Sequence, residues 1–172
     1  MEVSICKAEI GHEKELLNLF KKVVTIPDGI IRKRHEITAN YINDFYEKSL
    51  ENGLILFAKS KNSIVGEIHA YTPSIYAFQH ILTDLTIAIY PEFQGKGIGR
   101  KLFQTFLEIV KTEFHHILRV ELYTREHNKR NVAFYKSLGF INEGRQQHKI
   151  FNSKSKLETP LHMAWFNPNY LK

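Results

Sequence analysis

The chain has 172 residues, of which 43% are hydrophobic and 12% aromatic, and its formal net charge is +6. This length and apolar content predict a single folded domain over residues 1–172 and exclude a disordered chain. The basic residues are spread along the sequence, so the charge permits an anionic partner but gives no sign of a nucleic-acid surface.

The sequence predicts no signal peptide and no membrane span. The first residues lack the basic and apolar regions of a signal peptide, and no apolar run approaches the roughly 20 residues that span a membrane. The single cysteine, Cys6, excludes an internal disulfide and fits a reducing compartment. We therefore expect a cytoplasmic protein with no membrane or nucleic-acid partner, and the sequence leaves open whether it forms a homodimer.

Hydrophobic periodicity predicts two helices and four strands in the first half of the chain. Thr38 is placed to cap the second helix and Gly53 to close it. A tight turn at Lys61 and Asn62 joins two strands into a hairpin. The predicted elements are a strand over 3–10, helices over 12–23 and 39–53, and strands over 54–60, 63–71 and 81–90.

The second half alternates helices and strands. It predicts helices over 98–114 and 129–139 and strands over 119–126, 140–146 and 161–166. Helices that follow strands imply crossovers and parallel pairing, whereas the hairpin implies antiparallel pairing. The order βααβββαβαββ therefore predicts an α/β protein with a mixed sheet and helices on both faces.

The stretch "YPEFQGKGIGRKL", residues 90–102, opens a helix with glycines at 95, 97 and 99. Glycine removes side chains that keep a ligand from the main chain, and a helix N-terminus presents free N–H groups that bind phosphate. The cations Lys96, Arg100 and Lys101 oppose the helix dipole unless an anion is bound there. The turn therefore predicts a pyrophosphate site, and the alternative is a glycine-rich helix start that only tightens packing.

Two common nucleotide motifs are excluded. The turn has no GxxxxGK followed by Ser or Thr, and it is not GxGxxG after a first strand. What remains is Gln94-x-x-Gly97-x-Gly99, a Q/R-x-x-G-x-G/A pattern.

This loop and its helix resemble the acetyl-CoA-binding motif of the GNAT family of N-acetyltransferases. The stretch "HNKRNVAFYKSLGF" is similar to a second motif of that family, with Asn128, Tyr135 and Gly139–Phe140 at its Asn, Tyr and Gly-Phe positions. The similarity is specific over residues 85–140 and departs from the pattern at Arg130 and Asn131, where small residues are common. It implies an acyl-CoA N-acyltransferase fold, with a mixed sheet of about seven strands flanked by about four helices.

The resemblance also implies how acetyl-CoA is held. The strand edge at Ile87, Ala88 and Ile89 would pair with pantetheine, and the N–H of Ile89 would bind the thioester carbonyl oxygen as an oxyanion donor. Asn128 belongs to the same cofactor site. The remaining cofactor-binding residues are those of the glycine turn, namely Gln94, Gly95, Lys96, Gly97, Ile98, Gly99 and Arg100.

In the same family pattern, Tyr135 would protonate the leaving thiolate, and the alternative is a helix tyrosine that only packs. The general base cannot be transferred, because Tyr123 and Thr83 occupy positions where members of the family carry Glu. Asp84, next to Thr83, is the candidate base, because a partly desolvated carboxylate on this strand could accept the proton of the amine through water. Strand alternation counts against it, since it places Asp84 on the face opposite Leu85 and Ile87. Glu67 and Glu121 are weaker candidates, since charges on a solvated face explain them equally.

The nine histidines form no HxxxH or HExxH pattern, so we expect no metal site. The run "RKRHE", residues 32–36, lies in a loop that borders the acceptor in this family, where it could recognise an acidic acceptor or simply be solvated. The predicted function is transfer of an acetyl group from acetyl-CoA to a primary amine of a small molecule or peptide, by direct attack. The alternatives are a protein N-terminal acetyltransferase and a non-catalytic domain that senses acyl-CoA.

Overall fold

The computed structural model describes residues 2–27, 29–152, 154 and 156–171. Its helices are α1 (Glu13–Val23), α2 (Ala39–Asn52), α3 (Ile98–Glu113) and α4 (Lys129–Ser137), with short 3-10 turns at Arg34–Glu36, Tyr76–Phe78 and Pro91–Phe93. Its strands are β1 (Ser4–Lys7), β2 (Gly53–Ser60), β3 (Ser63–Tyr71), β4 (Ile81–Ile89), β5 (Arg119–Arg125), β6 (Ile141–Arg145), β7 (Ile150–Phe151), β8 (Leu157–Glu158) and β9 (Pro160–Phe166).

Seven of the strands form one mixed sheet in the order β1-β2-β3-β4-β5-β9-β6. β4 and β5 are parallel neighbours, and the other neighbouring strands are antiparallel. The predicted mixed sheet is therefore confirmed. The small hairpin of β7 and β8 lies outside this sheet and was not predicted.

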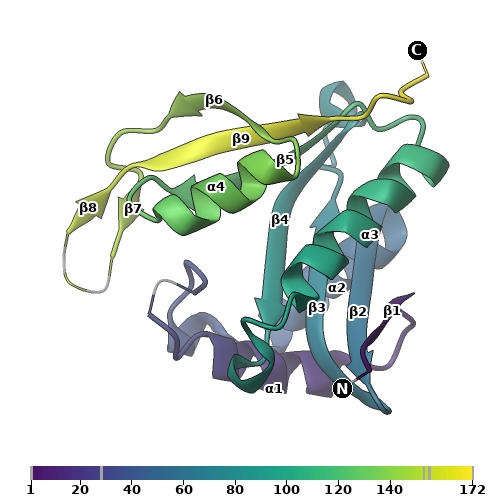
Figure 1. The fold of residues 1–172 in the computed structure, drawn as a ribbon, viewed down its shortest axis with the longest axis vertical. Helices are drawn as coiled ribbons and strands as arrows, with labels where there is room; N and C mark the ends of the chain where they lie inside the picture. Colours follow the sequence, from purple (N-terminus) through teal and green to yellow (C-terminus); the bar gives the residue numbers. More distant parts are fainter. Residues whose placement is uncertain (1, 28, 153, 155, 172) are drawn as a thin grey trace.

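Helices cover both faces of the sheet, as predicted (Figure 1). α3 and α4 cover one face, with a core that includes Leu102, Phe106 and Val120. α1 and α2 cover the other face of β1–β4, with a core that includes Phe20, Phe45 and Phe57. No helix in the described part of the chain is long and apolar enough to cross a membrane.

The local signals that start and end the helices are mostly those that the sequence predicts. The hydroxyl oxygen of Thr38 caps α2 by accepting a hydrogen bond from the Tyr41 N–H at 3.2 Å. Gly53 follows α2, but it is extended and begins β2 instead of forming a left-handed cap. A side chain at position 53 would collide with β3, because its Cβ would lie 2.2 Å from the Ala70 carbonyl oxygen.

Candidate active site between strands 4 and 5

The parallel strands β4 and β5 pair only at their beginnings and then diverge (Figure 1). The paired positions are Ile81 with Arg119 and Leu82 with Val120. Beyond them β4 continues to Ile89 with β3 as its only sheet neighbour among the described residues. The second edge of β4 therefore faces an opening between the two strands.

The main-chain groups of Ile87 and Ile89 face this opening. The N–H of Tyr90 donates to the Val65 carbonyl at 3.0 Å, and Ala88 is two residues from Tyr90 in the same antiparallel register with β3. Hydrogen-bonded pairs alternate along an antiparallel ladder, so the polar groups of Ala88 point to β3 and those of Ile87 and Ile89 point away from it. Ile87 and Ile89 thus present strand-edge groups, as predicted, whereas those of Ala88 are used within the sheet.

The glycine turn follows at the end of β4, and two of its glycines are required by their backbone conformation. Gly95 and Gly97 have φ of 73° and 79°, a left-handed conformation that L side chains rarely adopt. No atom lies within 4 Å of where a Cβ would stand at either position, so the space beside the turn is open. The side-chain Nε2 of Gln94 donates a hydrogen bond to the Ile89 carbonyl at 2.9 Å and fixes the turn against the strand.

The turn leaves main-chain donors without an internal acceptor. The first helical hydrogen bond of α3 runs from the Lys101 N–H to the Gly97 carbonyl at 3.1 Å. Within the described chain, the N–H groups of residues 95–100 donate to no main-chain oxygen. This arrangement at a helix N-terminus suits an anion.

Gly99 has a different role from the other two glycines. A Cβ there would lie 3.2 Å from Cδ1 of Ile89 and 3.8 Å from Cδ1 of Ile87. The glycine therefore lets the first turn of α3 approach β4. For this one glycine, the alternative explanation of close packing is correct.

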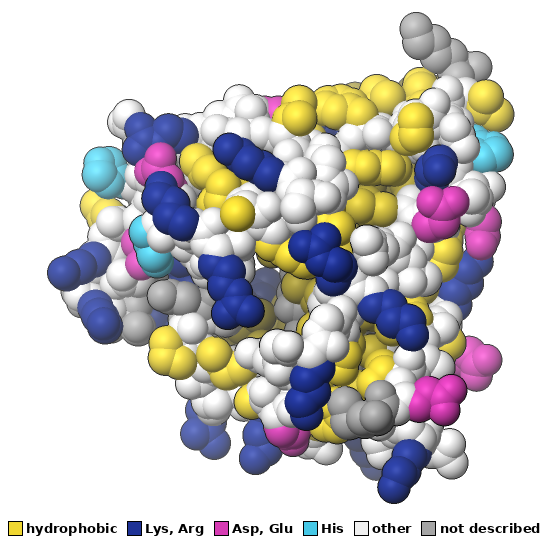
Figure 2. All heavy atoms as spheres, in the orientation of Figure 1, with side chains coloured by type: hydrophobic (Ala, Val, Ile, Leu, Met, Phe, Trp, Pro, Cys, Tyr) yellow, Lys and Arg dark blue, Asp and Glu magenta, His cyan; other side chains and the backbone are white. Residues whose placement is uncertain are grey.

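Three basic side chains lie around the turn, and each contacts a neighbouring residue through a hydrogen bond or an aromatic ring. Arg100 donates to the Ser137 hydroxyl at 3.0 Å and lies over the Phe134 ring, which ties α3 to α4. Lys96 lies over the Phe93 ring, and Lys101 donates to the Val3 carbonyl. Basic side chains are spread across the face that carries α3 and α4 (Figure 2). The field near the turn is therefore positive, as an anion site requires.

A cavity of about 440 Å³ opens between the diverging strands. Its lining comes from β4, β5, α4, α2 and the loop between α1 and α2. It thus connects residues that belong to the two different faces of the sheet. The lining residues are Gly29, Ile30, Ile31, Arg32, Glu36, Tyr41, Leu85, Thr86, Ile87, Tyr123 and Tyr135.

Tyr135 reaches this cavity from α4. Its ring packs edge-on against Phe103, Phe134 and Phe140, with ring centroids 5.5–6.0 Å apart. Its hydroxyl makes no hydrogen bond to any residue that the structure describes, and burial raises the pKa of Tyr135 to about 12. The side chain therefore packs, as one explanation predicted, and also presents a protonated hydroxyl to the cavity.

A family model described as the acetyltransferase (GNAT) family matches residues 20–140, more than two thirds of the chain. The chain belongs to the GNAT family. The sequence-based assignment of family and fold is therefore confirmed. A sequence search among curated proteins finds no significant match.

Solved structures resemble the chain over nearly its whole length. A Streptococcus mutans UA159 protein has 26% identity and a TM-score of 0.77, with 96% of this chain and 99% of that chain covered. A Salmonella typhimurium protein solved with acetyl-CoA has 14% identity and a TM-score of 0.84, with 100% and 98% covered. Spermidine N-acetyltransferase from Vibrio cholerae, solved with CoA and spermine, has 20% identity and a TM-score of 0.77, with 99% and 98% covered.

Asn128, the other cofactor-site residue of the GNAT pattern, lies at the start of α4. Its side-chain oxygen accepts a hydrogen bond from the Asn131 N–H at 3.1 Å and caps the helix. Only its amide nitrogen is left for a ligand. Asn131, a departure from the family pattern, therefore takes part in this cap through its main chain.

Asp84 does not line the cavity that contains Tyr135. It is exposed, has φ of 53° at a bulge of β4, and accepts a hydrogen bond from the Tyr71 hydroxyl at 2.8 Å. It borders a separate hollow beside α2, together with Tyr71 and Lys48. The prediction that this carboxylate is partly desolvated is wrong, because Asp84 is exposed to solvent at the bulge.

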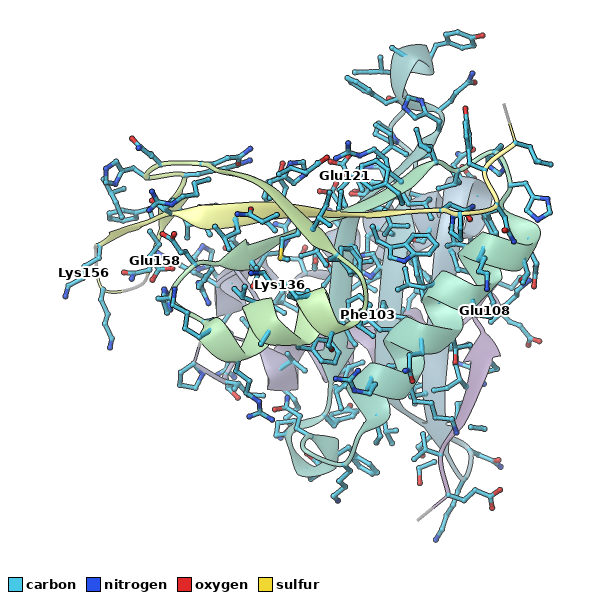
Figure 3. All side chains as sticks on the ribbon, turned by 45° about the horizontal axis from the view of Figure 1, so that its top comes forward. Phe103, Glu108, Glu121, Lys136, Lys156 and Glu158 are labelled. Atoms are coloured by element: carbon cyan, nitrogen blue, oxygen red, sulfur yellow. The ribbon has the colours of Figure 1, made fainter. Side chains whose placement is uncertain are left out.

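Glu67 and Glu121 are not the solvated charges that one explanation proposed. Glu67 is 0% exposed on β3, beside His69. Glu121 is half-buried between Arg119 and His162, at 3.7 Å and 2.7 Å. It lies across the β5–β9 part of the sheet from Phe103, on the face that α3 and α4 leave open (Figure 3). Neither carboxylate lines the cavity.

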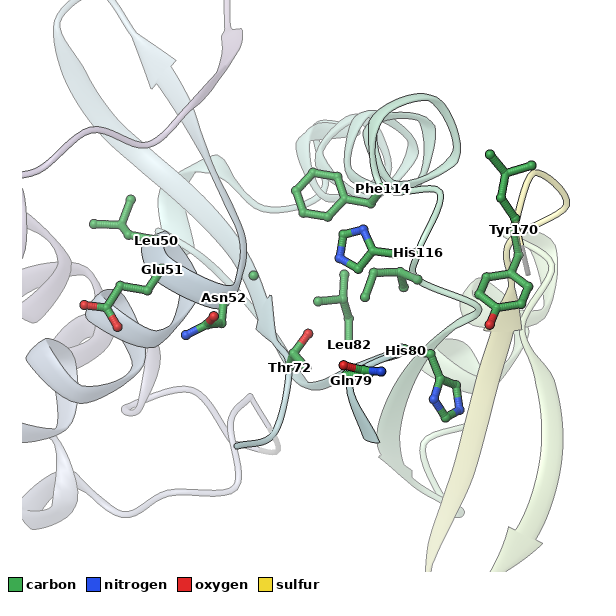
Figure 4. Close-up of a pocket in the computed structure, with 13 residues that line it drawn as sticks. Leu50, Glu51, Asn52, Thr72, Gln79, His80, Leu82, Phe114, His116 and Tyr170 are labelled. Carbon is green, nitrogen blue, oxygen red and sulfur yellow. The ribbon is translucent and has the colours of Figure 1, made fainter. Parts of the chain in front are cut away.

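A second hollow, of about 730 Å³, lies near the start of β4, where α2 and α3 end (Figure 4). It contains His80, His116 and Tyr170, and none of the residues that the sequence predicts for the site. No group of three or more His, Cys, Asp or Glu that could hold a metal ion occurs in the described residues. Arg32 and Glu36 line the cavity and belong to the run 32–36, whose loop borders the acceptor in the family that the sequence resembles. Tyr41 of α2 is a cavity residue that the sequence did not assign.

Proposed function

We propose that the protein is an N-acetyltransferase that transfers the acetyl group of acetyl-CoA to a primary amine by direct attack. The observation that carries this proposal is the cavity between β4 and β5. At its edge stand main-chain groups of β4 that are not paired with β3, and the glycine turn follows at the end of that strand. A donor bound along β4 from the turn and an acceptor bound beside the α1–α2 loop would meet in it.

The residues fit acetyl-CoA on three counts. The free N–H groups of residues 95–100 and the positive end of α3 suit its pyrophosphate. Open space beside Gly95 and Gly97 lets phosphate oxygens approach the main chain. The edge groups of Ile87 and Ile89 suit the amides of pantetheine, as an added strand would. Bound acetyl-CoA would supply an activated acyl group.

The N–H of Ile87 is the better oxyanion donor of the two edge groups. Ile87 lines the cavity, whereas Ile89 lies nearer the glycine turn and does not line it. A main-chain N–H fixed in a strand needs no reorganisation when charge develops on the carbonyl oxygen. We therefore assign the oxyanion role to Ile87 and pantetheine pairing to Ile89.

We assign Tyr135 as the donor of the proton that the leaving thiolate receives. A pKa of about 12 keeps its hydroxyl protonated near neutral pH, so it can donate. That pKa also lies above the roughly 8.5 of a free thiol, so the hydroxyl first stabilises the thiolate by a hydrogen bond. The proton that the acetylated nitrogen releases replaces the one that Tyr135 gives to the thiolate, so the products are the amide and the free thiol of CoA. Direct attack fits the described lining of the cavity, which contains no Cys, Ser or His to carry an acyl group.

The experiment is an acceptor screen with acetyl-CoA and a panel of amines and peptides. We expect free CoA thiol and an acetylated product to appear together for at least one amine. Binding of acetyl-CoA with no turnover on any amine would contradict the enzyme and support the acyl-CoA sensor. Turnover confined to peptide N-termini would support the protein N-terminal acetyltransferase.

A further inference from the structure

The acceptor end of the cavity contains an arginine held by an aromatic ring. The guanidinium of Arg32 lies over the Tyr41 ring, 4.0 Å from its centroid. The Arg32 side chain is 46% exposed, so it stands at the mouth, with one side toward the cavity and the other toward solvent. Stacking leaves the N–H edge of a guanidinium open to a planar anion.

Glu36 is the one carboxylate among the described residues that line the cavity. Its Oε2 accepts a hydrogen bond from the Lys33 N–H at 2.7 Å, which closes the short turn of the loop. Its Oε1 lies 3.7 Å from Nη1 of Arg32, too far for a hydrogen bond. An exposed pair of this kind contributes little energy, so Glu36 leaves the Arg32 donors available.

One lysine adds positive charge beside the cavity, and a second stands in the loop that carries Arg32. Nζ of Lys149 lies 4.1 Å from the centroid of the Tyr123 ring, which lines the cavity. Lys33 lies over the Phe151 ring, so the α1–α2 loop and strand β7 approach each other there. Arg32 and Lys149 are therefore basic groups at the cavity, against the one lining carboxylate of Glu36.

We propose that the acceptor is a primary amine that also carries a carboxylate, as an amino acid does, and that Arg32 binds this carboxylate. This inference rests on the proposed function. A carboxylate accepts two parallel hydrogen bonds from a guanidinium, which would fix the amine end of the acceptor toward Ile87 and Tyr135. A polyamine would instead place its further ammonium groups beside Arg32 and Lys149, where like charges repel.

The test compares each of a set of amino acids with the amine that lacks its carboxylate, such as tyrosine with tyramine and histidine with histamine, and includes spermidine. Each series is measured with acetyl-CoA on wild type, Arg32→Gln and Arg34→Gln. Arg34 is the matched control, because it is an exposed arginine of the same loop that does not line the cavity.

We expect the amino acids to have the higher kcat/KM, and Arg32→Gln to raise their KM about 10- to 100-fold, as loss of a charged hydrogen-bond pair does. The KM values of the decarboxylated amines should change little in Arg32→Gln. Arg34→Gln should leave the KM values of both series unchanged. Higher kcat/KM for the decarboxylated amines or spermidine, or an equal effect of Arg32→Gln on both series, would overturn the inference while leaving an N-acetyltransferase.

A binding measurement covers the case in which no amine in the set is turned over. Calorimetry of both series on the CoA-bound protein should then detect the amino acids alone, with binding lost in Arg32→Gln. Absence of amino-acid binding would overturn the inference.

Discussion

Glu67 and His69 form a buried pair on β3, with Oε2 of Glu67 3.0 Å from Nδ1 of His69. Neither residue is more than 2% exposed, and the His69 ring stacks on Phe45 of α2 at 4.0 Å. Burial is the larger influence and raises the pKa of Glu67, while His69 acts in the opposite direction. Folding therefore favours the protonated, neutral form of this carboxyl group over its charged form.

Glu67→Gln should change how stability depends on pH. A carboxyl group with a raised folded pKa contributes stability that is fully present below its unfolded pKa and is lost as pH rises through the folded pKa. Glutamine cannot lose a proton, so the variant should gain stability relative to wild type as pH rises above the ordinary carboxyl pKa near 4.5, by at most about 1.4 kcal/mol per pH unit.

Urea unfolding at several pH values measures this difference. Glu47→Gln, on the exposed face of α2, is the control for loss of one negative charge. A difference between Glu67→Gln and wild type that stays constant with pH would show that folding does not raise the pKa of Glu67.

Gly97→Ala should destabilise the protein by about 1–2 kcal/mol, because alanine is strained at a positive φ. Gly144→Ala is the control: space is also open there, but the φ is not positive, so its effect should stay within about 0.5 kcal/mol. Both are measured as free energies of unfolding. Equal effects of the two substitutions would contradict a left-handed turn at Gly97.

Tyr135→Phe should lower kcat by about 10²-fold or more while leaving the affinity for acetyl-CoA nearly unchanged. The ring keeps its contacts with Phe103 and Phe140, so the fold should not suffer. Steady-state kinetics with saturating acetyl-CoA measures the effect, and Tyr170→Phe, at the separate hollow, is the control. An unchanged kcat, with chemistry limiting turnover, would remove Tyr135 from the mechanism.

Asp84→Asn should lower kcat/KM far less than the roughly 10²-fold that loss of a general base costs. The residue is exposed and lines a different hollow from Tyr135, and an asparagine oxygen can still accept the Tyr71 hydrogen bond. A loss of 10²-fold or more, with acetyl-CoA binding intact, would instead identify Asp84 as the base.

Long periodic elements and the glycine turn could be predicted from the sequence, because their signals are local. The α1 stripe of Leu16, Leu19, Phe20 and Val23 is fully buried, and Thr38 caps α2 as expected. The hairpin of β7 and β8 was missed, since two residues per strand are too few to show an alternation.

The features that place site residues depend on tertiary structure. The divergence of β4 from β5 follows from how whole strands twist and pair, and the bulge at Asp84 has no turn residue to announce it. Glu67 lies on a central strand buried on both faces, where an alternating pattern cannot distinguish a core charge from a solvated one. Arg32 reaches the cavity only because its loop folds back over the β4–β5 opening.

The most direct measurement is calorimetric binding of acetyl-CoA to folded wild type, Gly97→Glu and Gly144→Glu. The account predicts binding to wild type and Gly144→Glu, and none to Gly97→Glu, because a carboxylate there would occupy and repel the pyrophosphate position. Undetectable binding to wild type, or equal binding to all three, would contradict a pyrophosphate site at the glycine turn.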